Sequence, residues 1–185
     1  MNKKIIILHD TFLYKWWGER LILMMAKSLK SDLASWFFSA GSFDLRAEGF
    51  KWKMISVSSE IFKKGFRHIK LKCAFLFKTW FLKKYDTVIF SGDSISAIRS
   101  CKKETKKIYY CHTPPRYLYD LNSLYLGKVP AILRPIFKLW FYIFRKAYER
   151  DIKKMDLIFY KIYFWVLFYD HKQAPVQVWY QPRIV

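Results

Sequence analysis

A short aliphatic run close to the start of the chain constrains the fold most strongly. Residues 4–9 read KIIILH, and no polar residue alternates with the isoleucines. A continuous β-branched run of this kind is typical of a parallel strand that is buried on both faces. After a loop, residues 18–29 place their apolar side chains on one helical stripe. Strand, loop and helix in this order predict the opening of a βαβ unit.

The alternation continues along the chain. We predict further strands over residues 34–39, 53–57, 87–91, 107–111 and 157–159, and further helices over 61–85, 92–101 and 129–154. Alternating strands and helices favour an α/β fold, in which a Rossmann-like parallel sheet with right-handed crossovers is flanked by helices. We assign residues 1–159 to this domain and residues 160–185 to an atypical tail, which is rich in aromatic residues and has no clear periodicity.

Composition narrows the class of protein. The 185 residues suit a single domain, and a hydrophobic content of 53% excludes intrinsic disorder. Three cysteines without a CxxC pair argue against a zinc ribbon and a secreted disulfide framework. No uncharged run approaches the roughly 20 residues of a membrane-spanning helix. We therefore expect a cytoplasmic protein, peripheral at most to the inner face of the plasma membrane, whose net charge of +20 favours anionic partners.

The predicted carboxyl ends of the strands carry most of the chemically useful residues. Ligands bind at this edge in open parallel sheets. His112 ends a buried strand there, and an imidazole can donate or accept a proton near neutral pH. His9 ends the first strand, where it either orients a ligand or closes a local hydrogen bond. Gly18 and Glu19 begin a helix, so they form either a phosphate site or an ordinary N-cap.

A long lysine-rich stretch suggests a second surface. Residues 61–85 combine many lysines with Phe, Ile and Trp side chains. A basic amphipathic helix can contact an anionic membrane, and we name Lys63, Lys64, Arg67 and Lys70 as candidate contacts. The alternatives are a core helix with a solvated outer face and a nucleic-acid surface. Nucleic acid is the least favoured, because the lysines are spread along the whole chain.

Three segments resemble a known enzyme family. Residues 9–29 (HDTFLYKWWGERLILMMAKSL), 85–97 (YDTVIFSGDSISA) and 106–121 (KKIYYCHTPPRYLYDL) are similar to the N-terminal half of family-4 retaining glycosyltransferases. These enzymes have the GT-B architecture of two Rossmann-like domains. The match is closest to a mannosyltransferase-like branch with a CHTPxRYLWD motif, and it covers about residues 3–159.

The resemblance implies a function and roles for the matched positions. It implies transfer of a sugar from a nucleotide-sugar, with GDP-mannose as a candidate donor, to a glycan or lipid-linked acceptor in polysaccharide biosynthesis. No further cofactor and no metal are implied. His112 would lie near the transferred sugar as the catalytic residue, and Gly18 and Glu19 would approach the donor phosphate. The residues assigned to the acceptor side are His9, Asp10, Arg116, Tyr117, Tyr119 and Asp120.

The sequence also departs from the family. The segments that would form a donor-binding domain do not follow residue 159, so we expect a truncated chain that is inactive alone, and we hypothesise that residues 160–185 are a frame-shifted reading. Trp16 and Trp17 replace a Gly-Gly pair that permits close backbone approach. We hypothesise that these two residues, together with Trp36 and Trp52, are glycines read from UGA codons. The alternative function is a non-catalytic basic module that binds anionic membrane or nucleic acid.

Overall fold

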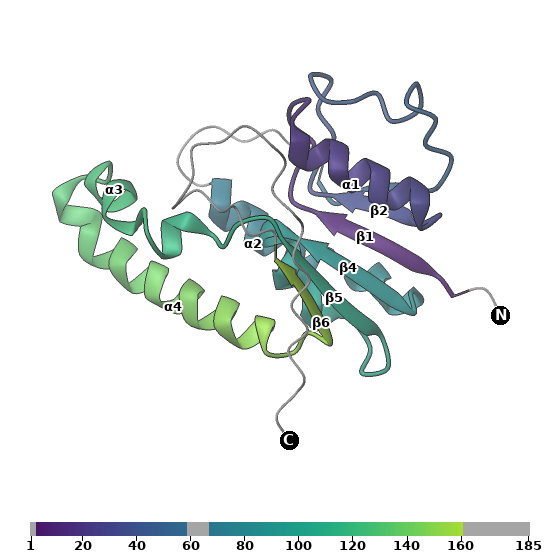
Figure 1. Ribbon diagram of the computed structural model, residues 1–185. Coiled ribbons are helices and arrows are strands. Elements are labelled where there is room, and N and C mark those ends of the chain that lie inside the picture. The colour runs from purple at the N-terminus through teal and green to yellow at the C-terminus, as the bar shows by residue number, and fades with distance from the viewer. Residues whose placement is uncertain (1–2, 59–66, 161–185) are drawn as a thin grey trace, which may run out of the picture.

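The computed structural model describes residues 3–58 and 67–160. Of the predicted tail over residues 160–185, only Tyr160 is described, as the last residue of a strand, and the frame-shift hypothesis for the rest lies outside the described residues. Within these residues the chain forms a six-stranded sheet in which every neighbouring pair is parallel (Figure 1). The strands are β1 (Ile5–His9), β2 (Asp32–Ser35), β3 (Met54–Ser56), β4 (Thr87–Ser91), β5 (Lys106–Cys111) and β6 (Leu157–Tyr160). Their order, β3-β2-β1-β4-β5-β6, is that of a Rossmann-like doubly wound sheet. The predicted α/β class is confirmed.

Helices flank the sheet on both faces. α1 (Trp17–Ser28) covers β1 and β2 on one side (Figure 1). The other side holds α2 (Arg67–Phe77), the 3-10 helix η2 (Gly92–Ser100) and α4 (Arg134–Ile152). The shorter connecting elements are η1 (Trp80–Lys84), η3 (Arg116–Leu118), α3 (Asn122–Gly127) and η4 (Ala131–Leu133).

The core lies on both faces of the sheet. Ile6, Ile7 and Leu8 in β1 are completely buried, because alternate side chains enter opposite layers. One layer joins Ile6 and Leu8 to α2 and α4, and the other joins Ile7 to α1. This explains the uninterrupted aliphatic run, which has no solvent-facing position.

The prediction of one helix over residues 61–85 is wrong in extent. α2 ends at Phe77, and η1 begins again at Trp80. Between them Thr79 is buried, and its hydroxyl donates to the Phe75 carbonyl at 2.6 Å and is 2.9 Å from the Ser100 hydroxyl. A side chain that bonds back to the preceding turn competes with continuation of the helix. Residues 61–66 lie outside the described part of the chain.

The predicted strand over residues 34–39 is also shifted. β2 covers Asp32–Ser35, and Trp36 then leaves the regular ladder with its N–H donated to the Asp10 carbonyl at 3.1 Å. Trp36 is 1% exposed and packs edge-on against Phe37. The indole therefore fills core volume, which argues against the hypothesis that this residue stands in for a glycine.

Candidate functional site

The topological switch point of the sheet lies between β1 and β4. β2 and β3 continue from one side of β1, and β4, β5 and β6 extend from the other. Crossovers leave in opposite directions at such a point, so the loops diverge and open a crevice beyond the carboxyl ends of the strands. The residues that end β1, β4 and β5 therefore define the candidate site.

His9 is fixed at this edge by a contact across the switch point. Its Nδ1 is 3.0 Å from the Oγ of Ser91, which ends β4. The imidazole is buried, with the Phe12 ring 5.3 Å away and the His112 ring 6.2 Å away, both edge-on. Burial, and to a smaller degree the charge on His112, lowers the pKa of His9 to about 3. His9 is thus neutral at physiological pH and offers a hydrogen bond rather than a charge.

Asp10 ties the end of β1 to the start of η2. Its Oδ1 accepts the backbone N–H of Ser94 at 2.9 Å. A carboxylate at this position occupies the place at a helix N-terminus where anions are stabilised. Burial and the neighbouring Asp93 nevertheless raise the pKa of Asp10 well above its usual value. The turn from β4 into η2 is therefore already capped by the protein itself.

Gly92 makes this close approach possible. Its backbone φ is +67°, a conformation that residues other than glycine adopt only at an energetic cost. A Cβ at this position would overlap both oxygens of the Asp10 carboxyl group. The segment 91–94 lies in the region where the sequence places a ligand edge, but the requirement for glycine becomes clear only from the packing.

A buried ion pair joins α2 to the start of η2. Lys72 on α2 places its Nζ 3.7 Å from Oδ1 of Asp93, and both side chains are less than 10% exposed. Tyr117 donates its hydroxyl to Oδ2 of Asp93 at 3.4 Å. The Lys72 ammonium also lies 5.4 Å from the centre of the Phe144 ring on α4. Sequence reasoning did not single out Asp93 as a functional residue, and it counted Lys72 among many surface lysines.

His112 lies at the end of β5, beside the other two strand ends. It is half-buried, and its ring centre is 4.7 Å from that of Tyr110 in edge-on geometry. The ring centre of His112 is 6.2 Å from that of His9, so the two imidazoles flank the switch point from β5 and β1. The structure therefore brings the His9 and His112 rings close together, whereas the Asp10 carboxyl group is turned to the start of η2.

The residues after His112 do not converge on this pair of imidazoles. Arg116 donates twice to Asp120 Oδ2, at 2.9 and 2.6 Å, in an exposed pair. Tyr117 is a core residue whose hydroxyl reaches Asp93. Tyr119 lies under the guanidinium of Arg145, 4.9 Å from the ring centre. All four of the predicted side chains in this segment are thus engaged in contacts within the domain, and Arg116 and Asp120 can reach a ligand only as an existing pair.

The start of α1 borders the crevice. Glu19 is buried and its carboxylate accepts the backbone N–H groups of Leu13 and Glu19, although burial has the larger effect and raises its pKa. At Gly18, no atom lies within 4 Å of the position that a Cβ would take, so no close approach within the domain requires glycine there. Trp16 and Trp17 are exposed, at 67% and 82%.

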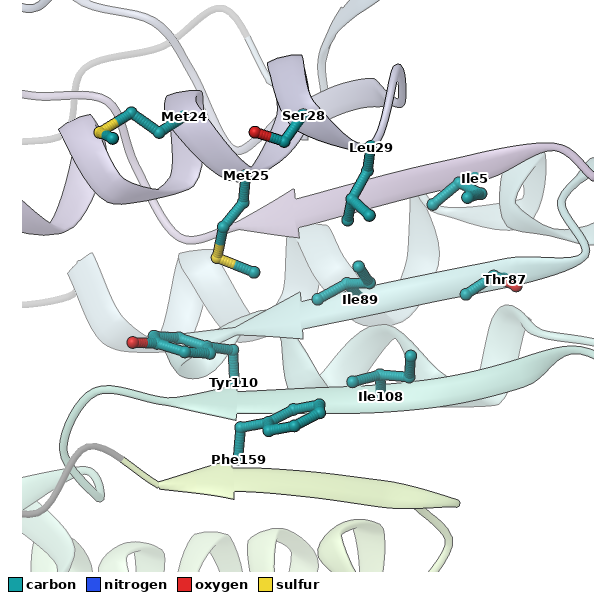
Figure 2. Close-up of a pocket in the computed structure, with 10 residues that line it drawn as sticks. All are labelled: Ile5, Met24, Met25, Ser28, Leu29, Thr87, Ile89, Ile108, Tyr110 and Phe159. Carbon is teal, nitrogen blue, oxygen red and sulfur yellow. The ribbon is translucent and has the colours of Figure 1, made fainter. Parts of the chain in front are cut away.

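An apolar pocket lies elsewhere, on the α1 face of the sheet. It has a volume of about 520 Å³ and extends between α1 and the exposed side of β4, β5 and β6 (Figure 2). The residues around it are Ile5, Met24, Met25, Ser28, Leu29, Thr87, Ile89, Ile108, Tyr110 and Phe159. Its lining carries no charged group, which makes it a poor site for a phosphate or for acid–base chemistry.

The predicted membrane contacts are only partly within view. Lys63 and Lys64 lie outside the described residues, Arg67 begins α2, and Lys70 on the same helix is exposed. In the described part of the chain, no helix combines the length and hydropathy needed to cross a bilayer. Over the same ranges, 3–58 and 67–160, no cluster of three or more His, Cys, Asp or Glu residues could hold a metal ion.

Comparisons with known proteins give little beyond the fold. No family model matches the chain, and no curated protein matches it. One solved structure with some likeness is a protein from Listeria monocytogenes provisionally named UDP-N-acetylglucosamine 2-epimerase, at 12% identity and a TM-score of 0.43. The likeness covers 86% of this chain and 40% of that protein, so the chain spans less than half the length of its neighbour. A likeness this low transfers no activity.

Proposed function

We propose that this chain is the acceptor-side, Rossmann-like half of a retaining glycosyltransferase with GT-B architecture. One observation carries the proposal. The three segments that resemble family-4 glycosyltransferases, residues 9–29, 85–97 and 106–121, include the carboxyl ends of β1, β4 and β5. These are three adjacent strands, and their ends flank the switch point where ligands bind in such sheets. The three segments that carry the resemblance therefore meet at one edge of the sheet.

The arrangement of the site suits a sugar transfer in which charge develops on the substrate. When the bond between the anomeric carbon and the diphosphate breaks, positive charge grows on the sugar ring and negative charge on the leaving group. The proposed role of His112 is to hydrogen-bond the transferred sugar. His9, neutral because of its low pKa, can position a sugar or acceptor hydroxyl without repelling the developing cation. The open N-terminal turn of α1 at Gly18 is the proposed approach for the donor phosphate.

The proposal also names the donor, the acceptor and the need for a second domain. A nucleotide-sugar is the substrate class, with GDP-mannose as first candidate, and a glycan or lipid-linked glycan is the acceptor. The described residues form one sheet, so we expect weak ligand binding by this half and turnover only when a donor-binding domain is supplied.

Thermal denaturation with nucleotide-sugars tests the proposal. If the dissociation constant is about 1 mM, ligand at 10 mM stabilises the folded state by about 1.4 kcal/mol. For a domain of this size the melting temperature should rise by about 3–6 °C. The ligands are GDP-mannose, a UDP-sugar and each nucleoside diphosphate alone, at constant ionic strength.

Matched variants locate the ligand. His112→Ala should abolish the rise, whereas Lys103→Ala, at the opposite edge of the sheet, should retain it. A rise that survives His112→Ala would place the ligand elsewhere. No rise with any nucleotide-sugar, together with retention on DNA that weakens steeply with salt, would support the basic-module alternative instead.

A further inference from the structure

The side chains of His9 and Ser91 form a closed contact at the carboxyl ends of β1 and β4. The two residues are direct partners in the register of these neighbouring strands. Nδ1 of the imidazole is 3.0 Å from the serine Oγ. Ser91 is completely buried and His9 is 8% exposed, so water is largely excluded from the contact. Each polar group in it therefore needs a hydrogen-bond partner within the protein.

The hydroxyl hydrogen of Ser91 sets the direction of this hydrogen bond. In the part of the chain that the structure describes, the hydroxyl has no acceptor other than Nδ1 of His9. If Nδ1 donated to the serine oxygen, the O–H group would be buried without an acceptor and would bear its full desolvation penalty. If the hydroxyl donates, the requirement is met. The hydrogen bond therefore runs from the Ser91 hydroxyl to Nδ1 of His9.

This direction determines which ring nitrogen of His9 carries a hydrogen. Burial lowers the pKa of His9 to about 3, so at physiological pH only one of the two nitrogens is protonated. Because Nδ1 accepts from Ser91, the hydrogen lies on Nε2. Over residues 3–58 and 67–160, Nε2 has no hydrogen-bond partner, and it is not fully enclosed. The Nε2–H group is thus the polar part of this buried ring that is left for a ligand.

Ser94 holds the two strand ends in this arrangement. Its hydroxyl donates to the Leu8 carbonyl at 2.7 Å, and its Oγ accepts the Ser91 N–H at 3.0 Å. One buried side chain thereby bridges the backbones of β1 and β4 beside the contact between His9 and Ser91. Support of this kind fixes a binding group before the ligand arrives. The Ser91 hydroxyl is therefore already in place in the free protein.

We propose that Ser91 is a positioning residue that holds His9 as the Nε2–H tautomer, so that His9 presents a hydrogen-bond donor to an oxygen atom of the ligand at the strand ends. An Nε2 atom that carries a hydrogen neither accepts a proton nor coordinates a metal ion, so His9 acts by binding alone. The oxygen that it meets is a sugar hydroxyl or a diphosphate oxygen. The inference deepens the proposed function and rests on it only for this choice of ligand.

NMR of the histidine ring nitrogens in the free, full-length chain tests the tautomer. Correlation of the ring protons with ¹⁵N separates a protonated nitrogen from one with a lone pair, and His9 should show a protonated Nε2 and an unprotonated Nδ1. Ser91→Ala should shift His9 toward the other tautomer. Ser96→Ala is the matched control, because it also removes a buried hydroxyl, which donates to the Asp93 carbonyl at 3.3 Å. It should leave the His9 signals unchanged.

Two results would overturn the proposal at this stage. One is a protonated Nδ1 with an unprotonated Nε2 in the parent protein, a measurement that requires no variant. The other is a Ser91→Ala protein whose His9 signals equal those of the parent. Melting curves establish that both variants are folded before their spectra are compared.

The same spectra with ligand identify the oxygen that His9 meets. With GDP-mannose, the Nε2 proton should shift downfield and exchange more slowly with water, and Ser91→Ala should lose this response. The same response to GDP alone would assign a diphosphate oxygen, and a response to GDP-mannose only would assign a sugar hydroxyl. Binding that raises the melting temperature without changing the Nε2 signal would overturn the donor role. No binding by any nucleotide-sugar would instead refute the proposed function, while the spectrum of the free protein still decides the tautomer.

Discussion

Replacing Gly92 with alanine should destabilise the protein more than any other glycine-to-alanine change in the described residues. The φ of +67° makes a non-glycine residue cost about 1–2 kcal/mol. The new Cβ would also displace the Asp10 carboxyl group and break its bond to the Ser94 N–H, and leaving this buried N–H without its acceptor costs about 1–3 kcal/mol. The sum is about 2–5 kcal/mol, which should lower the melting temperature by about 4–20 °C.

Two other glycines separate these contributions. Gly49 has a φ of +75° but no atom within 4 Å of a Cβ, so Gly49→Ala should cost only about 1–2 kcal/mol. Gly18→Ala meets neither obstacle and should change stability by less than about 1 kcal/mol. Urea denaturation of the three variants gives the comparison.

A double variant tests the cause. With Asp10→Ala in place, Gly92→Ala should cost no more than Gly49→Ala, because the obstructing carboxyl group is gone. The reasoning is refuted if Gly92→Ala and Gly49→Ala are equally destabilising in the parent protein, or if Asp10→Ala leaves the cost of Gly92→Ala unchanged.

Three further predictions concern the buried groups. Lys72→Met should destabilise by about 3–5 kcal/mol, because Asp93 keeps its charge without its cation, and Lys72→Met/Asp93→Asn should recover part of the loss in urea denaturation. The pKa of His9 is lower in the folded protein than in the unfolded chain, so the stability that neutral His9 contributes is present above pH 6.5 and is lost as pH falls toward 3. NMR titration should therefore show His9 neutral from pH 5 to 8. Protonation of His9 in that range would contradict the account. Trp36→Gly should cost about 3–5 kcal/mol or more by opening a cavity, while Trp17→Gly at an exposed position should cost about 1 kcal/mol or less; similar losses would contradict the assigned burial.

Much of the fold was predictable because it depends on local pattern. β1, β2 and β4 are short runs of mostly buried residues. The aliphatic run in β1 is explained by the rule that a strand covered on both faces has no polar positions. The proximity of His9 and His112 follows from the same source, since parallel strands end at one edge.

Other features depend on contacts between distant residues. Lys72 differs from its neighbours only because α2 presents it to Asp93, twenty-one positions further on, and no local pattern distinguishes it from an exposed lysine. Thr79 ends a helix through bonds that include Ser100. Apolar residues occur all around the first turns of α4, so periodicity could not show which stripe is buried and which faces outward.

Hydrogen–deuterium exchange with and without a nucleotide-sugar tests the central claim most directly. The account predicts that 10 mM GDP-mannose slows exchange in residues 9–18, 91–94 and 112–120, at the three strand ends beside the switch point. Exchange in residues 102–106, at the opposite edge of the sheet, should stay unchanged. Slowing that is confined to other segments, or absent at every nucleotide-sugar tested, would contradict a ligand site at this edge.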